Sequence, residues 1–81
     1  MSRIFVTCNS EYGVRDRRVV AVRHRGERAW QRSHRAVGMC VVSDPRTLQI
    51  GDVLMLASGD ELLTTSKLVG VRRGTVMSNA A

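Results

Sequence analysis

The sequence predicts an all-β fold, a small barrel of the SH3 or OB kind with about five to six short strands. Runs of Val, Ile and Leu are short, and Gly, Asn, Asp and Pro separate them. No window of the chain keeps apolar residues at helical spacing for three turns. Because 81 residues with a hydrophobic fraction of 43% can build one core, residues 1–81 are expected to form a single small β domain.

The first predicted strands flank a polar turn. In residues 3–8 the Ile, Val and Cys positions alternate with their neighbours, which predicts a strand. Residues 9–13 are Asn, Ser, Glu, Tyr and Gly, and they are expected to form the turn that ends this strand. The apolar run at residues 19–25 is the next predicted strand.

A hairpin is expected to follow, with Gly26 and Glu27 as its two-residue loop. Glycine at the first central position supplies the positive φ that a type II′ turn requires. The return strand is expected at residues 28–33. In this register Arg23 lies opposite Trp30.

The second half of the chain contains the remaining apolar runs. Pro45 ends the first of them, because proline removes a ladder donor. A short helix is expected at residues 46–49, and the tail at residues 74–81 is expected to fray or to dock on a neighbour. The remaining strands are expected at residues 37–42, 53–57, 61–65 and 67–72.

Charge is the strongest signal in the composition. Thirteen Lys and Arg against seven Asp and Glu give a formal net charge of +6, and all of these cations except Lys67 are Arg. The arginine guanidinium binds phosphate or carboxylate through two parallel hydrogen bonds, so this bias favours recognition of an anion. We therefore expect a polyanionic partner.

Eight of the arginines lie between residues 15 and 35, where the sequence also places both histidines and the only tryptophan. In the predicted hairpin Arg25 lies opposite Arg28, and such like-charge pairs cost stability unless an anion is bound. An exposed Trp30 would stack on an unpaired base while the arginines hold its phosphate. The residues predicted to bind nucleic acid or another anion are Arg15, Arg17, Arg18, Arg23, Arg25, Arg28, Trp30, Arg32 and Arg35.

The alternative for Trp30 is a place in the core, which is usual for the single tryptophan of a small domain. In that case the hairpin register shifts, and the arginines become scattered, solvated residues. The residues expected to be mostly buried are Val20, Val22, Val41, Val53, Met55 and Val71.

No catalytic residue is predicted, and the chain is not expected to be an enzyme. It contains no nucleophile elbow or phosphate loop, and its carboxylates lie at predicted turns and strand ends. Cys8 and Cys40 are expected to be reduced, buried thiols of a cytoplasmic protein, because no signal peptide or membrane-length apolar stretch is visible. The cysteines and histidines lack the tight spacing of a zinc site, so neither a metal nor a cofactor is predicted.

Two partial resemblances bear on function. The stretch at residues 38–43, followed by Leu48, by Gly51 and Asp52, and by residues 53–56 and 69–73, is similar to the second half of a PilZ cyclic-dinucleotide barrel. The resemblance implies a basic N-terminal motif, for which the three arginines within residues 15–18 are available. Over residues 33–38, where that family has D-x-S-x-x-G, only the glycine matches.

The second resemblance is broader. The pattern I-G-D-V-L at residues 50–54, followed by Gly59 and by V-G-V at residues 69–71, is similar to many small barrels. These include PUA-type RNA modules and phage head-to-tail connector proteins. Such a pattern supports the architecture more than any activity.

The leading hypothesis is a non-enzymatic module that binds nucleic acid mainly through phosphates, with low sequence specificity. One alternative is a phage-type structural, assembly or host-interaction protein whose basic face meets an acidic protein surface. Another is a PilZ-like barrel that binds a cyclic dinucleotide. Because a small domain buries a limited share of its surface, a homo-oligomer is also expected.

Overall fold

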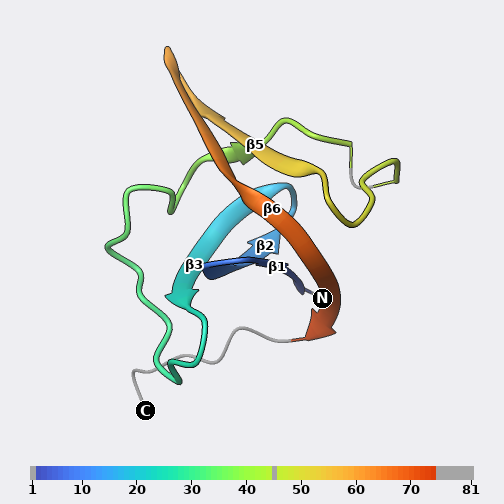
Figure 1. Cartoon of the computed structure of the whole chain (residues 1–81). Helices are drawn as coiled ribbons and strands as arrows, with labels where there is room; N and C mark the ends of the chain where they lie inside the picture. Colours follow the sequence, from blue (N-terminus) through green and yellow to red (C-terminus); the bar gives the residue numbers. More distant parts are fainter. Residues whose placement is uncertain (1, 45, 75–81) are drawn as a thin grey trace.

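The computed structural model describes residues 2–44 and 46–74 of the chain. Within them, six antiparallel strands form one closed ring sheet (Figure 1), which confirms the all-β prediction. No helix that is long and apolar enough to cross a membrane occurs in these residues. The strands are β1 (Ser2–Thr7), β2 (Ser10–Arg15), β3 (Arg18–His24), β4 (Cys40–Val41), β5 (Val53–Ser58) and β6 (Glu61–Gly74).

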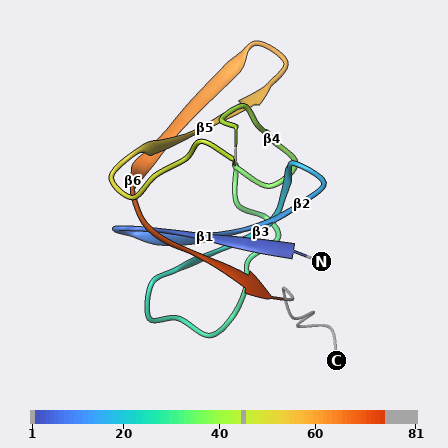
Figure 2. The ribbon, with the colours of Figure 1, turned by 90° about the vertical axis from the view of Figure 1, so that its right-hand side faces the viewer.

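The ring closes through its last strand. Each strand pairs with the one that follows it, and β6 also pairs with β1, so that Ser2 lies opposite Gly74. The first half of β6 pairs with β5 and its second half with β1 (Figure 2). The strands predicted at residues 61–65 and 67–72 are therefore one continuous strand, because the link between them passes through a register shift and not a turn.

The turn predicted at residues 9–13 is wrong, because most of this segment belongs to β2. The chain reverses direction before this strand, at Cys8 and Asn9. There the Thr7 Oγ1 accepts a hydrogen bond from the Ser10 amide at 3.1 Å and donates one to the Ser10 carbonyl at 3.0 Å. These two local bonds close the hairpin early, so residues whose types favour a turn enter a strand.

The return strand predicted at residues 28–33 does not form, and a loop joins β3 to β4 instead. The turn spans residues 24–27, so Gly26, with a φ of +89°, is its second central residue and not its first. A single bridge remains, in which Val22 and Gln31 exchange two backbone hydrogen bonds. This bridge keeps the register of the predicted hairpin, although the strand around it is absent from the described residues.

Apolar side chains fill the inside of the ring. Leu54 and Leu56 of β5 are fully buried there. Of the residues predicted to be buried, Val22 and Val41 are confirmed, whereas Val20 is half-buried. The core therefore draws on strands from both halves of the chain.

Three of the burial predictions are wrong. Val53 and Met55 of β5 are 39% and 40% exposed, and Val71 of β6 is 46% exposed. In β5 the buried residues are the alternate ones, Leu54 and Leu56. Because both alternating sets of residues in β5 are apolar, the composition of the strand does not tell which set faces the core.

A smaller apolar cluster lies on the outer face of the ring. Trp30, from the β3–β4 loop, packs there with Ile4 and Ala21. Ile4 lies opposite Gly13, and Gly13 lies opposite Ala21. Because Gly13 and Ala21 carry little or no side chain, this part of the outer face has room for the indole ring.

The segment around β4 also differs from the prediction. β4 is Cys40–Val41, shorter than the strand predicted at residues 37–42. In place of the short helix predicted at residues 46–49 there is a turn, held by hydrogen bonds to the Asp44 carbonyl and carboxylate. The tail predicted to fray lies, beyond Gly74, outside the described residues.

Both cysteine thiols are free. Cys8 lies exposed in the turn between β1 and β2, so its predicted burial is wrong. Cys40 of β4 is half-buried.

Candidate functional site

The structure separates the nine residues predicted to bind an anion. Arg15, Arg17 and Arg18 lie exposed at the turn between β2 and β3. Arg23 and Trp30 pack together on the outer face of the sheet. The single basic hairpin face predicted from the sequence is therefore not formed. The remaining four arginines, which lie exposed along the β3–β4 loop, are Arg25, Arg28, Arg32 and Arg35.

Arg23 belongs to an internal network. Its guanidinium donates hydrogen bonds to the Oε1 of Glu11, at 2.9 Å from Nη2 and 3.3 Å from Nε. Its Nη1 also donates to the carbonyl of Arg28 at 3.3 Å. Arg72 of β6 donates to the same Glu11 oxygen, so one largely buried carboxylate joins β2, β3 and β6. The Arg23 charge is thus compensated inside the protein, and its role in the fold is structural.

Trp30 is a core residue, with 6% of its surface exposed. The guanidinium carbon of Arg23 lies 4.3 Å from the centroid of its ring, so the two residues predicted to lie opposite each other form a cation–π contact. The hypothesis that Trp30 is displayed for stacking on a base is wrong for this conformation, because protein covers the ring. The predicted alternative of a core position for Trp30 is therefore confirmed, but the register shift expected with it is wrong, because the bridge between Val22 and Gln31 keeps the predicted pairing.

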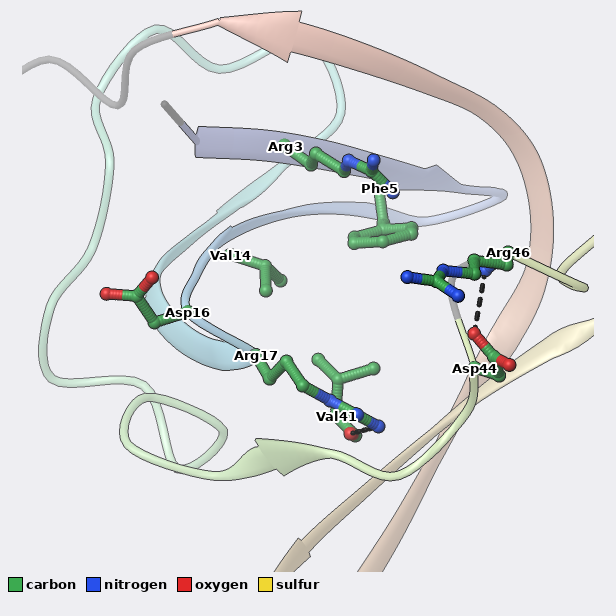
Figure 3. A pocket seen from close by; sticks show the side chains of 8 residues that line it. All are labelled: Arg3, Phe5, Val14, Asp16, Arg17, Val41, Asp44 and Arg46. Carbon is green, nitrogen blue, oxygen red and sulfur yellow. Dashed lines mark hydrogen bonds between the residues drawn. The ribbon is translucent and has the colours of Figure 1, made fainter.

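A pocket of about 650 Å³ lies between β1, the β2–β3 turn and β4, and we call it the mouth pocket (Figure 3). Its apolar wall consists of Phe5, Val14 and Val41, which belong to the inner core. Guanidinium groups reach it from three different segments of the chain (Figure 3). The residues that line it are Arg3, Phe5, Val14, Asp16, Arg17, Val41, Asp44 and Arg46.

The β2–β3 turn places Arg17 at this pocket. Asp16 and Arg17 are its two central residues, with φ values of +51° and +65°. A turn with positive φ at both central positions normally contains Asn and Gly, because a Cβ is disfavoured there. An arginine in this conformation is a strained residue, and Arg17 Nη2 makes only a long hydrogen bond of 3.4 Å to the Val41 carbonyl. Figure 3 shows the Asp16 carboxylate directed away from the three arginines.

Arg46 is placed by the turn that follows β4. The carboxylate of Asp44 accepts a hydrogen bond from the Arg46 amide at 2.9 Å, and the Asp44 carbonyl accepts one from the Thr47 amide at 3.1 Å. These bonds fix the backbone on both sides of Arg46 and leave its side chain to extend over the pocket (Figure 3). Asp44 therefore has a local explanation as a turn residue.

Arg3, the third arginine that lines the mouth pocket, lies on β1. It lies in phase with Phe5, whose side chain fills the inner core, so Arg3 projects on the same face of the strand. Neither Arg3 nor Arg46 was among the predicted site residues. For Arg3 the available signal was its place two residues before Phe5, on the same face of the strand, whereas no sequence pattern links Arg46 to this site.

Within residues 2–44 and 46–74, the guanidiniums of the mouth pocket form no ion pair with a carboxylate. In the described part of the chain, the only ion pairs join Glu11 to Arg23 and to Arg72. The three mouth arginines Arg3, Arg17 and Arg46 therefore keep an uncompensated positive charge beside an apolar wall. Such an arrangement can hold an anionic ligand.

Other ionisable groups do not form a second site. Over residues 2–44 and 46–74 there is no group of three or more His, Cys, Asp or Glu side chains able to hold a metal ion. Burial lowers the pKa of His34, and so does electrostatic repulsion from the nearby His24 and Arg35. The Nδ1 of His34 accepts a hydrogen bond from the Ala36 amide at 3.1 Å.

In comparisons with protein-family models, curated proteins and solved structures, no match to this chain was found.

Proposed function

We propose that this chain is a non-enzymatic binding module for nucleic acid, held mainly through its phosphates and with low sequence specificity. One observation carries the proposal: in the described residues only two arginine side chains, Arg23 and Arg72, form an ion pair with a carboxylate, and they share Glu11. The other arginines add to a net charge of +6 and are available to an external anion. Uncompensated guanidiniums are the groups that replace counterions on a phosphate backbone.

The placement of these arginines supports an extended ligand. They occur around the mouth pocket and along the β3–β4 loop. Arg18, which follows Arg17 in the chain, donates from its Nη1 to the Gly38 carbonyl of that loop at 3.3 Å. A phosphate chain can follow such a spread of charges, whereas a small anion would need one compact cluster. We also propose the finer assignment of the ring sheet to the small barrels of the SH3 or OB kind, in which binding of oligonucleotides is common.

A second candidate function is the phage-type assembly or host-interaction role. It is favoured by exposed apolar residues on β5 and β6, where Met55 is 40%, Val69 42% and Leu62 67% exposed. Exposed apolar side chains beside polar ones are typical of protein interfaces. A protein partner would therefore be expected on the outer face of β5 and β6.

The test is a titration of fluorescent RNA and DNA oligonucleotides with the purified protein at increasing salt. Binding should weaken steeply with salt, and each lost phosphate contact should lower the log-log slope by about 0.7 to 0.9. Two charge-matched variants locate the contacts. The mouth variant is Arg3→Gln, Arg17→Gln and Arg46→Gln, and the loop variant is Arg25→Gln, Arg28→Gln and Arg32→Gln.

Each variant removes three positive charges from +6 and leaves +3, so a difference between them reports position and not net charge. Arg23 is left intact, because its loss would uncover Trp30 and leave Glu11 with one partner fewer. If the wild-type protein binds no oligonucleotide even at low salt, the nucleic-acid proposal is wrong, and the protein-interaction candidate takes its place.

A further inference from the structure

The hairpin between β5 and β6 projects beyond the rest of the ring in both views (Figures 1 and 2). It closes at Gly59 and Asp60. On the side away from β5, the pairing of β6 with β1 begins only at Leu68. In the described part of the chain, residues 61–66 of β6 therefore have a neighbouring strand on one side only.

The backbone of Met55 shows which way the opposite residue of β6 faces. The Met55 carbonyl accepts a hydrogen bond from the Val42 amide at 2.8 Å, and its amide donates one to Ser43 Oγ at 3.1 Å. Thr64 lies opposite Met55 in the ladder. Because hydrogen-bonded and non-hydrogen-bonded pairs alternate along an antiparallel ladder, the amide and carbonyl of Thr64 face away from β5. Those of Leu62, two residues earlier, face the same way.

A bulge in β6 keeps this edge open. The register against β5 shifts between Val53 and Met55. There the Oγ1 of the buried Thr65 accepts a hydrogen bond from the Leu54 amide at 3.1 Å and donates one to the Ser66 carbonyl at 2.8 Å. A bulge bends its strand, so the later part of β6 turns to β1 and the hairpin tip stays outside the ring.

The open segment has few of the features that protect an edge strand. Proteins often place lysine or proline on such a strand to prevent pairing with another chain. Residues 61–66 read E-L-L-T-T-S and contain neither. The side chain of Leu62 is also 67% exposed. The segment is therefore suited to pairing with a further strand.

We propose that residues 61–66 of β6, which we call the β6 edge, pair antiparallel with the same residues of a second copy of this chain. In the two-fold pairing centred on Leu63, Leu62 of each copy exchanges backbone hydrogen bonds with Thr64 of the other. Both residues already direct their backbone groups to this side, so the hairpin keeps its conformation. This addition of a strand to an open sheet edge is a common mode of recognition.

Charge favours a second copy over nucleic acid at the β6 edge. Residues 58–66 contain the carboxylates of Asp60 and Glu61 and no Lys or Arg, in a protein whose net charge is +6. Lys67 follows directly at the other end of this segment. Antiparallel pairing places the acidic turn of one copy near Lys67 of the other, and the two-fold axis repeats this contact.

The pairing also covers apolar surface. Leu62 lies opposite Ala57, on the same outer face of the hairpin as Met55. In the dimer the Leu62 side chains of the two copies are diagonal neighbours across the new pair of strands, within reach of each other. Because the bulge keeps the new ladder short, the buried area is small, and we expect a weak dimer that depends on concentration.

Sedimentation equilibrium over about a hundredfold range of protein concentration tests the dimer. The mean mass of the wild type should rise towards twice the monomer mass and no further. Thr64→Pro removes an amide that β5 does not use, so it should raise the Kd of the dimer about tenfold or more. Thr64→Val keeps the amide and the shape of the side chain, and it should dimerise like the wild type.

A second pair of variants separates the edge from the outer face. Leu62→Lys puts a positive charge on the β6 edge and should weaken the dimer. Met55→Lys adds the same charge to the same face, at a residue of β5 that is 40% exposed, and it should leave the dimer intact.

A monomer at every concentration overturns the inference, and so does a mass that grows beyond the dimer. Loss of the dimer through Met55→Lys to the same extent as through Leu62→Lys overturns the edge in favour of a contact between faces. If circular dichroism shows that Thr64→Pro does not fold, Leu62→Lys and its Met55→Lys control carry the test. Because no oligonucleotide takes part, any of these results leaves the proposed function unaffected.

Discussion

The guanidinium carbon of Arg23 lies 4.3 Å from the centroid of the Trp30 ring, so a cation that is itself paired with Glu11 covers one face of the indole. The loop that carries Trp30 is thereby fastened to the outer face of the sheet. This arrangement makes the only tryptophan of the chain a structural residue and a fluorescent reporter of folding.

We expect Trp30→Ala to destabilise the protein by about 3–5 kcal/mol, because it removes a buried aromatic side chain and leaves a cavity next to Ile4 and Ala21. Urea denaturation followed by circular dichroism measures the change. Trp30→Phe, which keeps part of the ring, should cost clearly less. A stable Trp30→Ala variant that has lost only oligonucleotide binding would restore the base-stacking hypothesis.

Arg17→Gly should raise stability by about 1 kcal/mol, because glycine adopts the φ of +65° without the steric cost of a Cβ. The same change should weaken oligonucleotide binding. Arg17→Ala is the control, since it removes the guanidinium and keeps the Cβ, so it should weaken binding without the gain in stability. A stability unchanged by Arg17→Gly would show that the turn is not strained.

The two faces of β5 should respond differently to truncation. Leu54→Ala should cost about 2–5 kcal/mol, because Leu54 is fully buried in the ring. Met55→Ala should cost less than about 1 kcal/mol, because Met55 is 40% exposed on the opposite face. Thermal or urea unfolding of the two variants checks the assignment, and the reverse order of costs would mean that the faces are exchanged.

Stability should fall in mildly acidic solution through His34. Burial, His24 and Arg35 lower the pKa of His34 below its ordinary value of 6.5, so the unfolded chain takes up the proton more readily than the folded one. The contribution of His34 is then complete above the ordinary pKa and is lost as pH falls towards the folded value. Protonation of Nδ1 would also remove the acceptor of the Ala36 amide.

The measurement compares urea unfolding of the wild type and His34→Asn between about pH 7.5 and pH 5. Asparagine keeps an acceptor near the Ala36 amide but does not titrate in this range. The wild type should lose more stability than the variant on acidification. Parallel curves for the two proteins would show that His34 does not carry the effect.

The sequence was sufficient where one local signal dominates. The alternation around Phe5 located β1, and the turn residues Gly59 and Asp60 located the hairpin between β5 and β6. The strand β2 was not predicted, because the types of its first residues favour a turn. Their place in a strand depends on contacts with residues that are distant in the sequence. The carboxylate of Glu11, for example, is satisfied by arginines of β3 and β6 that lie far away in the chain.

The candidate site was only partly predictable for the same reason. Clustering of arginines in the sequence pointed to Arg17, which lines the mouth pocket, but also to Arg23, which is neutralised. Contacts between strands decide which arginines have a carboxylate partner. The spacing of residues in the sequence carries no information about these contacts. Arg46 reaches the pocket only because β4 and its following turn lie across the ring from β1.

The pairing of β1 with β6 also determines the order in which this protein can assemble. β1 obtains its second neighbour from β6, which is synthesised after the other described strands, so a nascent chain without β6 can form the β1–β2–β3 meander but cannot close the ring. Contacts between such distant segments are slow to form, because a long loop must be closed before they are made. We therefore expect ring closure to be the late step of folding, and until it occurs one edge of β1 stays open to pairing with other chains.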